Sequence, residues 1–371
     1  MKIILFYHSI LSDWNHGNAH FLRGVCYSLQ KMGHEVLVYE PQGGWSLTSL
    51  LQDYGNKALE EFKIKFPHLT TNFYDPLDYD LRVMLQGADM VIVHEWNDPE
   101  MVRAIGEFRL VQDFTLFFHD THHRAVSAKS DMEKYDLSHY DGVLAFGESL
   151  KEVYHQERWH ERVWTWHEAA DLNTYYPIEN KEYLGDVVWV GNWGDEERTQ
   201  ELHEFIIEPI KALKLKAKFY GVRYPQHAID ALNQAGIEYG GYLPSAKVAE
   251  TFSRYKVTIH VPRRFYRKFL PGIPTIRPFE AMACKIPLLS APWEDAEKLF
   301  TPGKDYLVAQ NGQDMMILLA KVLTETNFTE TMVNHAYQTV ASRHTCDHRA
   351  EELLDIYQEC MAEKTKKGGL S

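Results

Sequence analysis

The segments KIILFYH (residues 2–8), AHFLRGVCYSLQK (19–31) and EVLVY (35–39) determine the fold class of this chain. The first and third are short apolar runs typical of buried strands. The middle segment has apolar residues at helical spacing, and Gly33 follows its end. A strand, a helix and a second strand in this order predict a βαβ unit, and therefore a parallel, doubly wound α/β sheet.

Further apolar runs recur at similar spacing, and polar residues follow several of them. The runs cover residues 88–94, 115–119 and 142–146 in the first half, and 187–191, 218–221, 257–260 and 286–289 in the second. Ligand sites of such sheets lie at the carboxyl ends of the strands, so the polar residues found there are candidates for binding. Because the second series repeats the first, we expect two Rossmann-like domains.

The length of 371 residues fits two cores of ordinary size. We expect an amino-terminal domain over residues 1–178, a polar linker over 179–186 and a carboxyl-terminal domain over 187–345. Residues 346–371 predict a helix that packs back across the hinge, followed by a Lys/Gly tail. Two facing domains would form a central cleft, which is the usual ligand site.

Composition narrows the class of protein. Hydrophobic residues make up 45% and charged residues 25%, as in globular proteins. No apolar run is long enough for a bilayer, and the opening run breaks at His8, too early for a signal peptide, so we expect a cytoplasmic protein. Four cysteines without a CxxC pair predict reduced, buried thiols. The net charge of −13 disfavours nucleic acid as a partner.

Four cations follow the predicted strand that ends at residue 260. They are Arg263, Arg264, Arg267 and Lys268. Guanidinium groups bind phosphates through paired hydrogen bonds, so this cluster predicts a diphosphate site. The alternative is a solvated surface turn.

A Gly/Pro loop then leads into a short helix that begins near Thr275 and Ile276. Free amides at a helix start, with Arg277 beside them, favour an anion. Glu280 lies about one turn further on. Its carboxylate either favours the helix dipole or accepts hydrogen bonds from two vicinal ribose hydroxyls, and both interpretations stay open.

The run RPFEAMAC (residues 277–284), followed by IPLLS (286–290), resembles the nucleotide-sugar signature of GT-B glycosyltransferases of the group 1 or family 4 type. The KMGHEV opening (31–36), the HEAADL segment (167–172) and the Gly303 region extend the resemblance over most of the chain. The spore-maturation CgeB-like branch is the most similar. The resemblance implies two Rossmann-like domains and a UDP- or GDP-sugar as donor, with no separate cofactor.

The resemblance also implies roles for individual residues. Glu280 takes the place of the carboxylate that binds the donor ribose, and Arg198 falls near the lysine that binds donor phosphate. Gly17 falls in a glycine loop that approaches the phosphates, and His119 matches a histidine near the reacting sugar.

Three positions depart from the family pattern. Gly272 stands where the family has a carboxylate that contacts the donor sugar, eight positions before Glu280. Asn192 replaces a phosphate-binding arginine, and Lys285 replaces a glycine. The donor sugar and the stereochemical outcome therefore stay open, and Arg263, Arg264 and Lys268 are expected to supply positive charge.

His119 and Asp120 are the candidates for a base that accepts the proton of the acceptor. They open the run HDTHHR (119–124), which has no obvious remote partner for a metal, and we interpret it as a sugar-binding segment. We attribute the DYD match at 78–80 to coincidence. The HEW run (94–96) either lines the acceptor side or belongs to the core edge.

The sequence thus predicts a metal-independent glycosyltransferase acting on an unknown acceptor, such as a glycan, a protein or a small molecule. A nucleotide-sugar epimerase or hydrolase is an alternative, and so is a non-catalytic sugar-binding protein involved in surface assembly, because fold does not determine reaction. The sequence does not define the oligomeric state.

Overall fold

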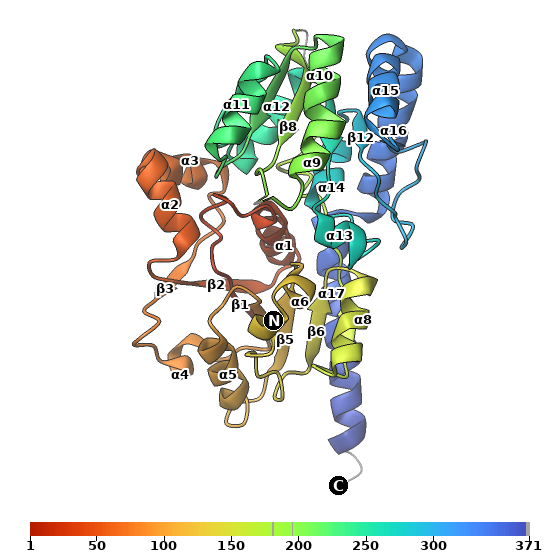
Figure 1. Cartoon of the computed structure of the whole chain (residues 1–371). Coiled ribbons are helices and arrows are strands. Elements are labelled where there is room, and N and C mark those ends of the chain that lie inside the picture. Colours follow the sequence, from red (N-terminus) through yellow and green to blue (C-terminus); the bar gives the residue numbers. More distant parts are fainter. Residues whose placement is uncertain (180–181, 195, 369–371) are drawn as a thin grey trace. The chain divides into compact units, whose positions relative to one another are not determined.

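The computed structural model describes residues 1–179, 182–194 and 196–368 of the chain (Figure 1). The chain divides into two compact units. The first unit comprises Met1–Glu168 and the terminal helix α17 (Cys346–Gly368), and the second comprises Ala169–Thr345. Residues 180 and 181 of the predicted linker and residues 369–371 of the predicted tail lie outside the described residues.

The described part of the first unit contains a seven-stranded parallel sheet of order β3-β2-β1-β4-β5-β6-β7. Its strands are β1 (Lys2–Phe6), β2 (Glu35–Pro41), β3 (Asn72–Tyr74), β4 (Met90–His94), β5 (Thr115–Asp120), β6 (Gly142–Ala145) and β7 (Val163–Thr165). The connecting helices are α1 (Ala19–Lys31), α2 (Trp45–Tyr54), α3 (Lys57–Lys65), α4 (Leu81–Met84), α5 (Pro99–Phe108), α6 (Arg124–Ser127), α7 (Lys129–Met132) and α8 (Glu148–Glu157). The strand order reverses between β1 and β4, which is where ligands bind in open α/β sheets.

Helix α1 forms because its apolar residues recur on one face. Phe21, Leu22, Val25 and Leu29 are fully buried, and each such side chain contributes about 1.5–3 kcal/mol to stability. The helix ends before Gly33, whose φ of +87° turns the chain toward β2.

Helix α17 packs against α1 within the first unit. Asp347 accepts hydrogen bonds from Ser28 and Lys31 of α1, both at 2.7 Å. The indole of Trp166 donates to the carbonyl of Arg349 at 2.9 Å. The carboxyl-terminal helix therefore completes the amino-terminal unit.

In the second unit, the described residues form a six-stranded parallel sheet of order β10-β9-β8-β11-β12-β13. Its strands are β8 (Gly185–Val190), β9 (Ala217–Tyr220), β10 (Glu238–Tyr239), β11 (Tyr255–His260), β12 (Leu288–Ser290) and β13 (Leu307–Val308). The helical segments are α9 (Thr199–Leu202), the π-helix η1 (His203–Ile207), α10 (Glu208–Leu213), α11 (Gln226–Gln234), the 3-10 helix η2 (Ser245–Lys247), α12 (Val248–Ser253), α13 (Arg264–Lys268), α14 (Ile276–Ala283), α15 (Gly312–Thr324) and α16 (Thr326–Arg343). The strand order reverses between β8 and β11.

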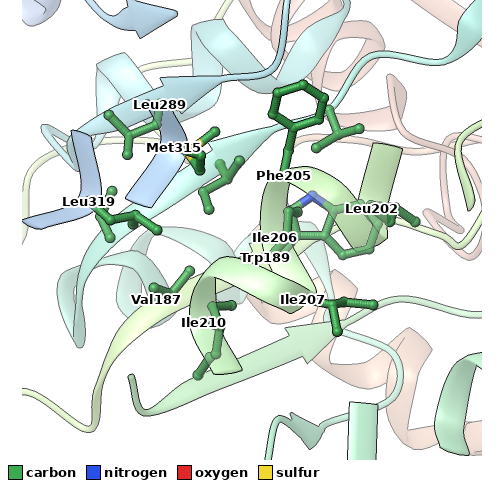
Figure 2. Close-up of a cluster of buried hydrophobic side chains, with 14 of the residues drawn as sticks. Val187, Trp189, Leu202, Phe205, Ile206, Ile207, Ile210, Leu289, Met315 and Leu319 are labelled. Carbon is green, nitrogen blue, oxygen red and sulfur yellow. The ribbon is translucent and has the colours of Figure 1, made fainter. Parts of the chain in front are cut away.

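Figure 2 shows the core of this second unit, in which the sheet packs against the η1, α10 and α15 segments. Trp189 of β8 lies among Phe205, Ile206, Leu289 and Met315, all buried. The two parallel, doubly wound sheets confirm the predicted α/β fold class. The four cysteines are buried and unbridged, as predicted.

Among the described helices, none has the combination of length and apolarity needed to cross a membrane.

Candidate functional site

Arg198 lies in the loop that follows β8, at the reversal of strand order in the second sheet. Its Nη1 donates to the carbonyl of Val261, beyond β11, at 2.8 Å, and its Nη2 donates to the carbonyl of Asn192 at 2.5 Å. The guanidinium also lies over the ring of Trp189, 5.1 Å from its centroid. A Cβ on Gly194, which has a φ of +93°, would lie 3.1 Å from Nε of Arg198. Glycine at this position therefore allows the loop to close around the cation.

The charge of Arg198 is held by backbone carbonyls and an aromatic face. Within the described residues it has no ion pair with a carboxylate. Burial and the neighbouring charge of Arg263 lower the pKa of Arg198, although a guanidinium stays protonated in a protein. A partly enclosed cation without a carboxylate partner is suited to binding an anion.

The predicted cation cluster follows β11, on and before helix α13. Arg263 pairs with Glu197 at 3.0 Å, and Arg264 approaches Glu201 at 3.5 Å. Lys268 is exposed and has no ion pair among the residues described. Glu197 and Glu201 thus partly neutralise two of the predicted phosphate ligands. The sequence alone did not indicate these ion pairs.

A hydrogen-bonded chain links β12, β11 and the start of helix α14. Ser290 donates to the carbonyl of Ala291 at 2.8 Å, so its oxygen accepts from Nδ1–H of His260 at 3.1 Å. His260 Nε2 then carries the lone pair and accepts from the hydroxyl of Thr275 at 3.3 Å. Burial and the charges of Arg198 and Arg277 lower the pKa of His260 to about 3, which keeps this ring neutral.

Thr275, which precedes helix α14, has a φ of +36°. A β-branched residue in this region is strained by roughly 1–3 kcal/mol, and such strain concentrates at functional sites. Its side chain does not cap the helix, because it is directed to His260. The helix therefore begins at the buried Ile276 with amides that no side chain caps, as an anion site requires.

Glu280 is buried on α14 and forms an ion pair with Arg277, three residues earlier. The hydroxyl of Tyr175 also interacts with Glu280. The pKa of Tyr175 is raised mainly by burial and also by this carboxylate. The carboxylate predicted for ribose is thus neutralised within its own helix, and Arg277 is not an isolated cation.

Gly272 stands at the position where a second carboxylate was expected. Its φ is +91°, and a Cβ there would lie 3.0 Å from Cβ of Ala296. A glutamate at this position would be strained and crowded, so the departure from the family pattern is built into the loop.

In the first unit, His119 and Asp120 form the end of β5 and both are fully buried. The His119 ring lies 4.8 Å from that of Trp166 and 6.2 Å from that of Phe21, and burial lowers its pKa to about 3. Asp120 accepts hydrogen bonds from the Tyr154 hydroxyl at 2.8 Å and from a backbone amide. Burial raises the pKa of Asp120. Gly17, by contrast, lies in an exposed turn before α1.

A buried ion pair lies beside these residues. Glu95 follows β4 and pairs with Arg124 at 2.7 Å, and the guanidinium lies 4.3 Å from the ring centroid of Trp96. Burial and the charge of Asp120 raise the pKa of Glu95, while Arg124 lowers it. The sequence indicated residues 94–96 as a possible site but gave no role to Arg124.

Four histidine rings gather at this carboxyl edge. His119 was predicted as a site residue and His94 as part of a possible acceptor-side segment, whereas the other two histidines had no predicted role. His8 follows β1, His16 lies in the loop before α1, and His94 ends β4. The His8 and His16 centroids are 4.0 Å apart, His8 and His94 are 5.8 Å apart, and His94 and His119 are 5.2 Å apart. A signal was present in the sequence, because three of these residues end or follow strands. Within the described residues, no group of three or more His, Cys, Asp or Glu side chains has the geometry to hold a metal ion.

Comparison with known proteins identifies the architecture. Residues 198–355 match the model of a family described as glycosyl transferase-like. No curated protein matches the sequence. The matched segment includes Arg198, Glu280 and most of the second unit.

Solved structures match almost the whole chain at low sequence identity. Sucrose-phosphate synthase from Thermosynechococcus elongatus has a TM-score of 0.65 and 13% identity, covering 98% of this chain and 100% of that chain. Anabaena Alr3699/HepE, in complex with UDP and glucose, has a TM-score of 0.67 and 13% identity, covering 96% and 99%. T4 phage BGT, in complex with UDP and Mn²⁺, has a TM-score of 0.61 and 12% identity, covering 97% and 99%. The fold is that of GT-B glycosyltransferases.

Proposed function

We propose that this protein transfers a sugar from a nucleotide-sugar donor, UDP- or GDP-linked, to a hydroxyl of an acceptor, without a bound metal ion. The donor binds at the reversal of strand order in the second sheet. The observation that carries this proposal is Arg198, a cation anchored by backbone carbonyls at that point and without a carboxylate partner among the described residues.

The diphosphate of the donor is the group that these residues would bind. Arg198 supplies the uncompensated charge, Arg263 and Arg264 supply charge that Glu197 and Glu201 partly offset, and the amides of Ile276 and Arg277 supply helix-dipole donors. Lys268 extends the cluster to solvent. As the bond between the anomeric carbon and the diphosphate breaks, negative charge grows on the leaving group, and preformed donors stabilise it.

The ribose would be held by Glu280, whose carboxylate has oxygen lone pairs beyond those used by Arg277 and Tyr175. The uridine diphosphate in the Anabaena and T4 phage structures supports a nucleotide at a fold of this kind. We interpret the 277–284 motif as that of the family 4 type, near the CgeB-like branch. Buried, unbridged cysteines support a reducing compartment, in agreement with the expected cytoplasmic location.

The acceptor, whether glycan, protein or small molecule, is assigned to the first unit. Of the two proposed bases, His119 has both ring nitrogens without a hydrogen-bond partner among the described residues, whereas Asp120 is held by Tyr154. This contrast favours His119 as the residue that meets the reacting sugar or the acceptor hydroxyl.

Calorimetric titration tests the donor site. UDP and uridine are titrated in EDTA into the wild type, into Arg198→Gln and into Arg82→Gln, an exposed cation of α4 that serves as the matched control. We expect UDP to bind the wild type in EDTA and to bind Arg198→Gln about 10- to 100-fold more weakly, with uridine and the control variant changed less than about threefold. UDP binding that requires a divalent ion would overturn metal independence, and equal losses for UDP and uridine would overturn the role of Arg198.

Turnover separates the proposal from its rivals. Incubation of UDP-sugars with a panel of acceptors should release UDP only when an acceptor is present. Release without an acceptor would indicate a hydrolase, and formation of an epimer would indicate an epimerase. Donor binding without any release would indicate a non-catalytic protein.

A further inference from the structure

The four histidines His8, His16, His94 and His119 form a continuous group at the reversal of strand order in the first sheet, here called the histidine cluster. Each is at most 5% exposed. Within the described residues, six of their ring nitrogens have no hydrogen-bond partner: both of His8, Nε2 of His16, Nδ1 of His94 and both of His119. Buried polar atoms without a partner are rare in folded proteins and cost about 1–3 kcal/mol each. Such a concentration of buried nitrogens without partners, at the reversal of strand order in a parallel sheet, indicates a ligand site.

The tautomer of His94 follows from its neighbours. The hydroxyl of Thr121 accepts from the Asn18 amide at 2.6 Å and lies 3.3 Å from Oε1 of Glu95. Oε1 of Glu95 accepts from the Thr121 hydroxyl while its Oε2 accepts from Arg124, so the hydroxyl hydrogen of Thr121 is directed to Glu95. Nε2 of His94, 3.1 Å from the Thr121 oxygen, must therefore be the donor. Nδ1 of His94 is left with a lone pair that requires a donor from the ligand.

The remaining rings also need hydrogen-bond partners, and His8 and His119 each need both a donor and an acceptor. Burial, together with the charge of Arg124 for His8 and His94, lowers the pKa values of the cluster, so its imidazoles are neutral. A neutral imidazole offers one N–H donor and one acceptor nitrogen. Hydroxyl groups, which both donate and accept, match this pattern. A phosphate or carboxylate, which only accepts, does not match it, and Glu95 already neutralises Arg124.

An aromatic face lies beside the cluster. Trp45, the first residue of α2, stacks on His8 with ring centroids 5.4 Å apart and an interplanar angle of 12°, and it is 42% exposed. Trp14 and Trp96 lie 6.4 Å from Trp45 and 6.2 Å from His8. Flat apolar rings next to neutral hydrogen-bonding groups fit a ligand that has both an apolar face and a hydroxylated edge.

We propose that the acceptor is an uncharged carbohydrate, held by hydrogen bonds to the histidine cluster and by contact with Trp45. This inference rests on the proposed function, because it assigns the substrate class of the acceptor side. His94 Nδ1 accepts from one sugar hydroxyl, and His8 both donates to and accepts from others. The sugar is either free or part of a larger carrier, and the recognition chemistry is the same for both.

Saturation-transfer NMR with a panel of neutral mono- to tetrasaccharides tests the proposal. The panel is paired with glucuronate and glucose 6-phosphate as anionic probes, and with a dodecyl glycoside of each sugar that binds, as a carrier-linked probe. We expect at least one neutral saccharide to bind the wild type and the anionic probes to bind at least tenfold more weakly. A dodecyl glycoside that binds with the free sugar's affinity indicates recognition of the sugar alone, and a tighter one indicates that a carrier adds contacts.

Two variants and a control assign that binding to the cluster. His8→Phe keeps a ring against Trp45 but removes both nitrogens, and Trp45→Ala removes an exposed side chain. Each should weaken the saccharide at least tenfold and change UDP affinity less than twofold. His155→Phe, on the exposed surface of α8, is the matched control and should change neither. If His8→Phe fails to fold, Trp45→Ala alone decides the assignment.

The outcomes separate this inference from the donor proposal. If the wild type binds UDP but no neutral saccharide, or prefers the anionic probes, the carbohydrate assignment is overturned and the proposed function stands. If neutral saccharides bind equally well to wild type, His8→Phe and Trp45→Ala, the cluster is not the site. If saccharides bind as expected while UDP does not bind, the proposed donor site fails and the carbohydrate site remains.

Discussion

At the carboxyl edge of the first sheet the histidine cluster presents neutral imidazoles, whereas at the same edge of the second sheet Arg198, Arg263 and Arg277 present guanidinium groups. Both sheets are parallel and reverse their strand order at a central pair, β1/β4 and β8/β11. The shared topology therefore fixes where a ligand binds, and the side chains after those strands fix its charge. A neutral acceptor and an anionic donor are the two ligands that this difference suits.

The difference between the two units should be largest at acidic pH, where the first unit should lose more stability than the second. The pKa values of His8 and His119 are lowered to about 3 by burial, and those of His16 and His94 are also lowered. Because the unfolded value is about 6.5, stability is intact above pH 6.5 and falls as the pH drops toward 3, since only the unfolded chain takes up the protons. His8 and His119 alone should remove on the order of 5 kcal/mol between pH 6.5 and 4.5, at about 1.4 kcal/mol per histidine and pH unit.

In the second unit His260 is a counterpart, because burial and the charges of Arg198 and Arg277 lower its pKa to about 3. Hydrogen exchange, corrected for the intrinsic effect of pH, should therefore show that β1 and β4 lose protection before β8 and β11. His119→Phe should reduce the acid sensitivity of the first unit. Equal loss of protection in the two sheets would show that the histidine cluster does not make the first unit more sensitive to acid than the second.

The next largest effect concerns the buried charge of the second unit. Glu280→Gln removes the charge that Arg277 pairs with and that ribose hydroxyls would contact. Losing a charged hydrogen-bond partner costs about 1.5–3 kcal/mol, so affinity for the nucleotide should fall roughly 10- to 100-fold. Calorimetric titration of UDP measures this, with Glu250→Gln, an exposed carboxylate of α12, as the control.

A dideoxy ligand sharpens the same test. 2',3'-Dideoxy-UDP should bind the wild type weakly and lose little more in Glu280→Gln, because both changes remove one contact. Losses that simply add would show that Glu280 serves only its partner Arg277 and that the ribose lies elsewhere.

A smaller loss is expected at helix α13. Arg263→Ala with Arg264→Ala should weaken UDP about tenfold and uridine less than twofold, because only UDP carries the charge that they meet. The effect is smaller than that of Arg198→Gln, since Glu197 and Glu201 already offset these cations. Raising the salt concentration should narrow the difference between UDP and uridine. An equal loss for both ligands would indicate a folding defect.

Helix α1 illustrates what the sequence could predict. Its periodic apolar face and the following Gly33 give bounds of 19–31, and the structure has Ala19–Lys31. Strands were located to within a few residues, as with 88–94 against Met90–His94, because buried parallel strands are continuous apolar runs. Local periodicity carries this information, and no long-range contact is needed.

The candidate site depended on contacts that local pattern does not contain. Arg263 and Glu197 are 66 positions apart, and their pairing follows from the packing of the loops after β8 and β11. The histidine cluster was missed for the same reason, because β1 and β4 are neighbours only once the strand order is known. The Arg277–Glu280 pair, at a spacing of three on one helix, was visible in the sequence and was overlooked.

The smallest expected effect concerns Thr275, where the second unit holds strain. Thr275→Gly relieves the strain of a φ of +36°, which stabilises the fold by roughly 1–3 kcal/mol. It also destabilises the fold by about 1 kcal/mol through the backbone entropy of glycine, and by about 1 kcal/mol through loss of the hydrogen bond to His260 at 3.3 Å. Stability should therefore change by less than about 1 kcal/mol. Affinity for UDP should fall about threefold, because the amides of α14 are no longer held in one direction. Thr275→Ser keeps the hydroxyl and should bind UDP within twofold of the wild type. Thermal unfolding and calorimetric titration measure both quantities, and a glycine variant that binds UDP normally but unfolds several degrees lower would show that Thr275 supports the fold rather than the anion site.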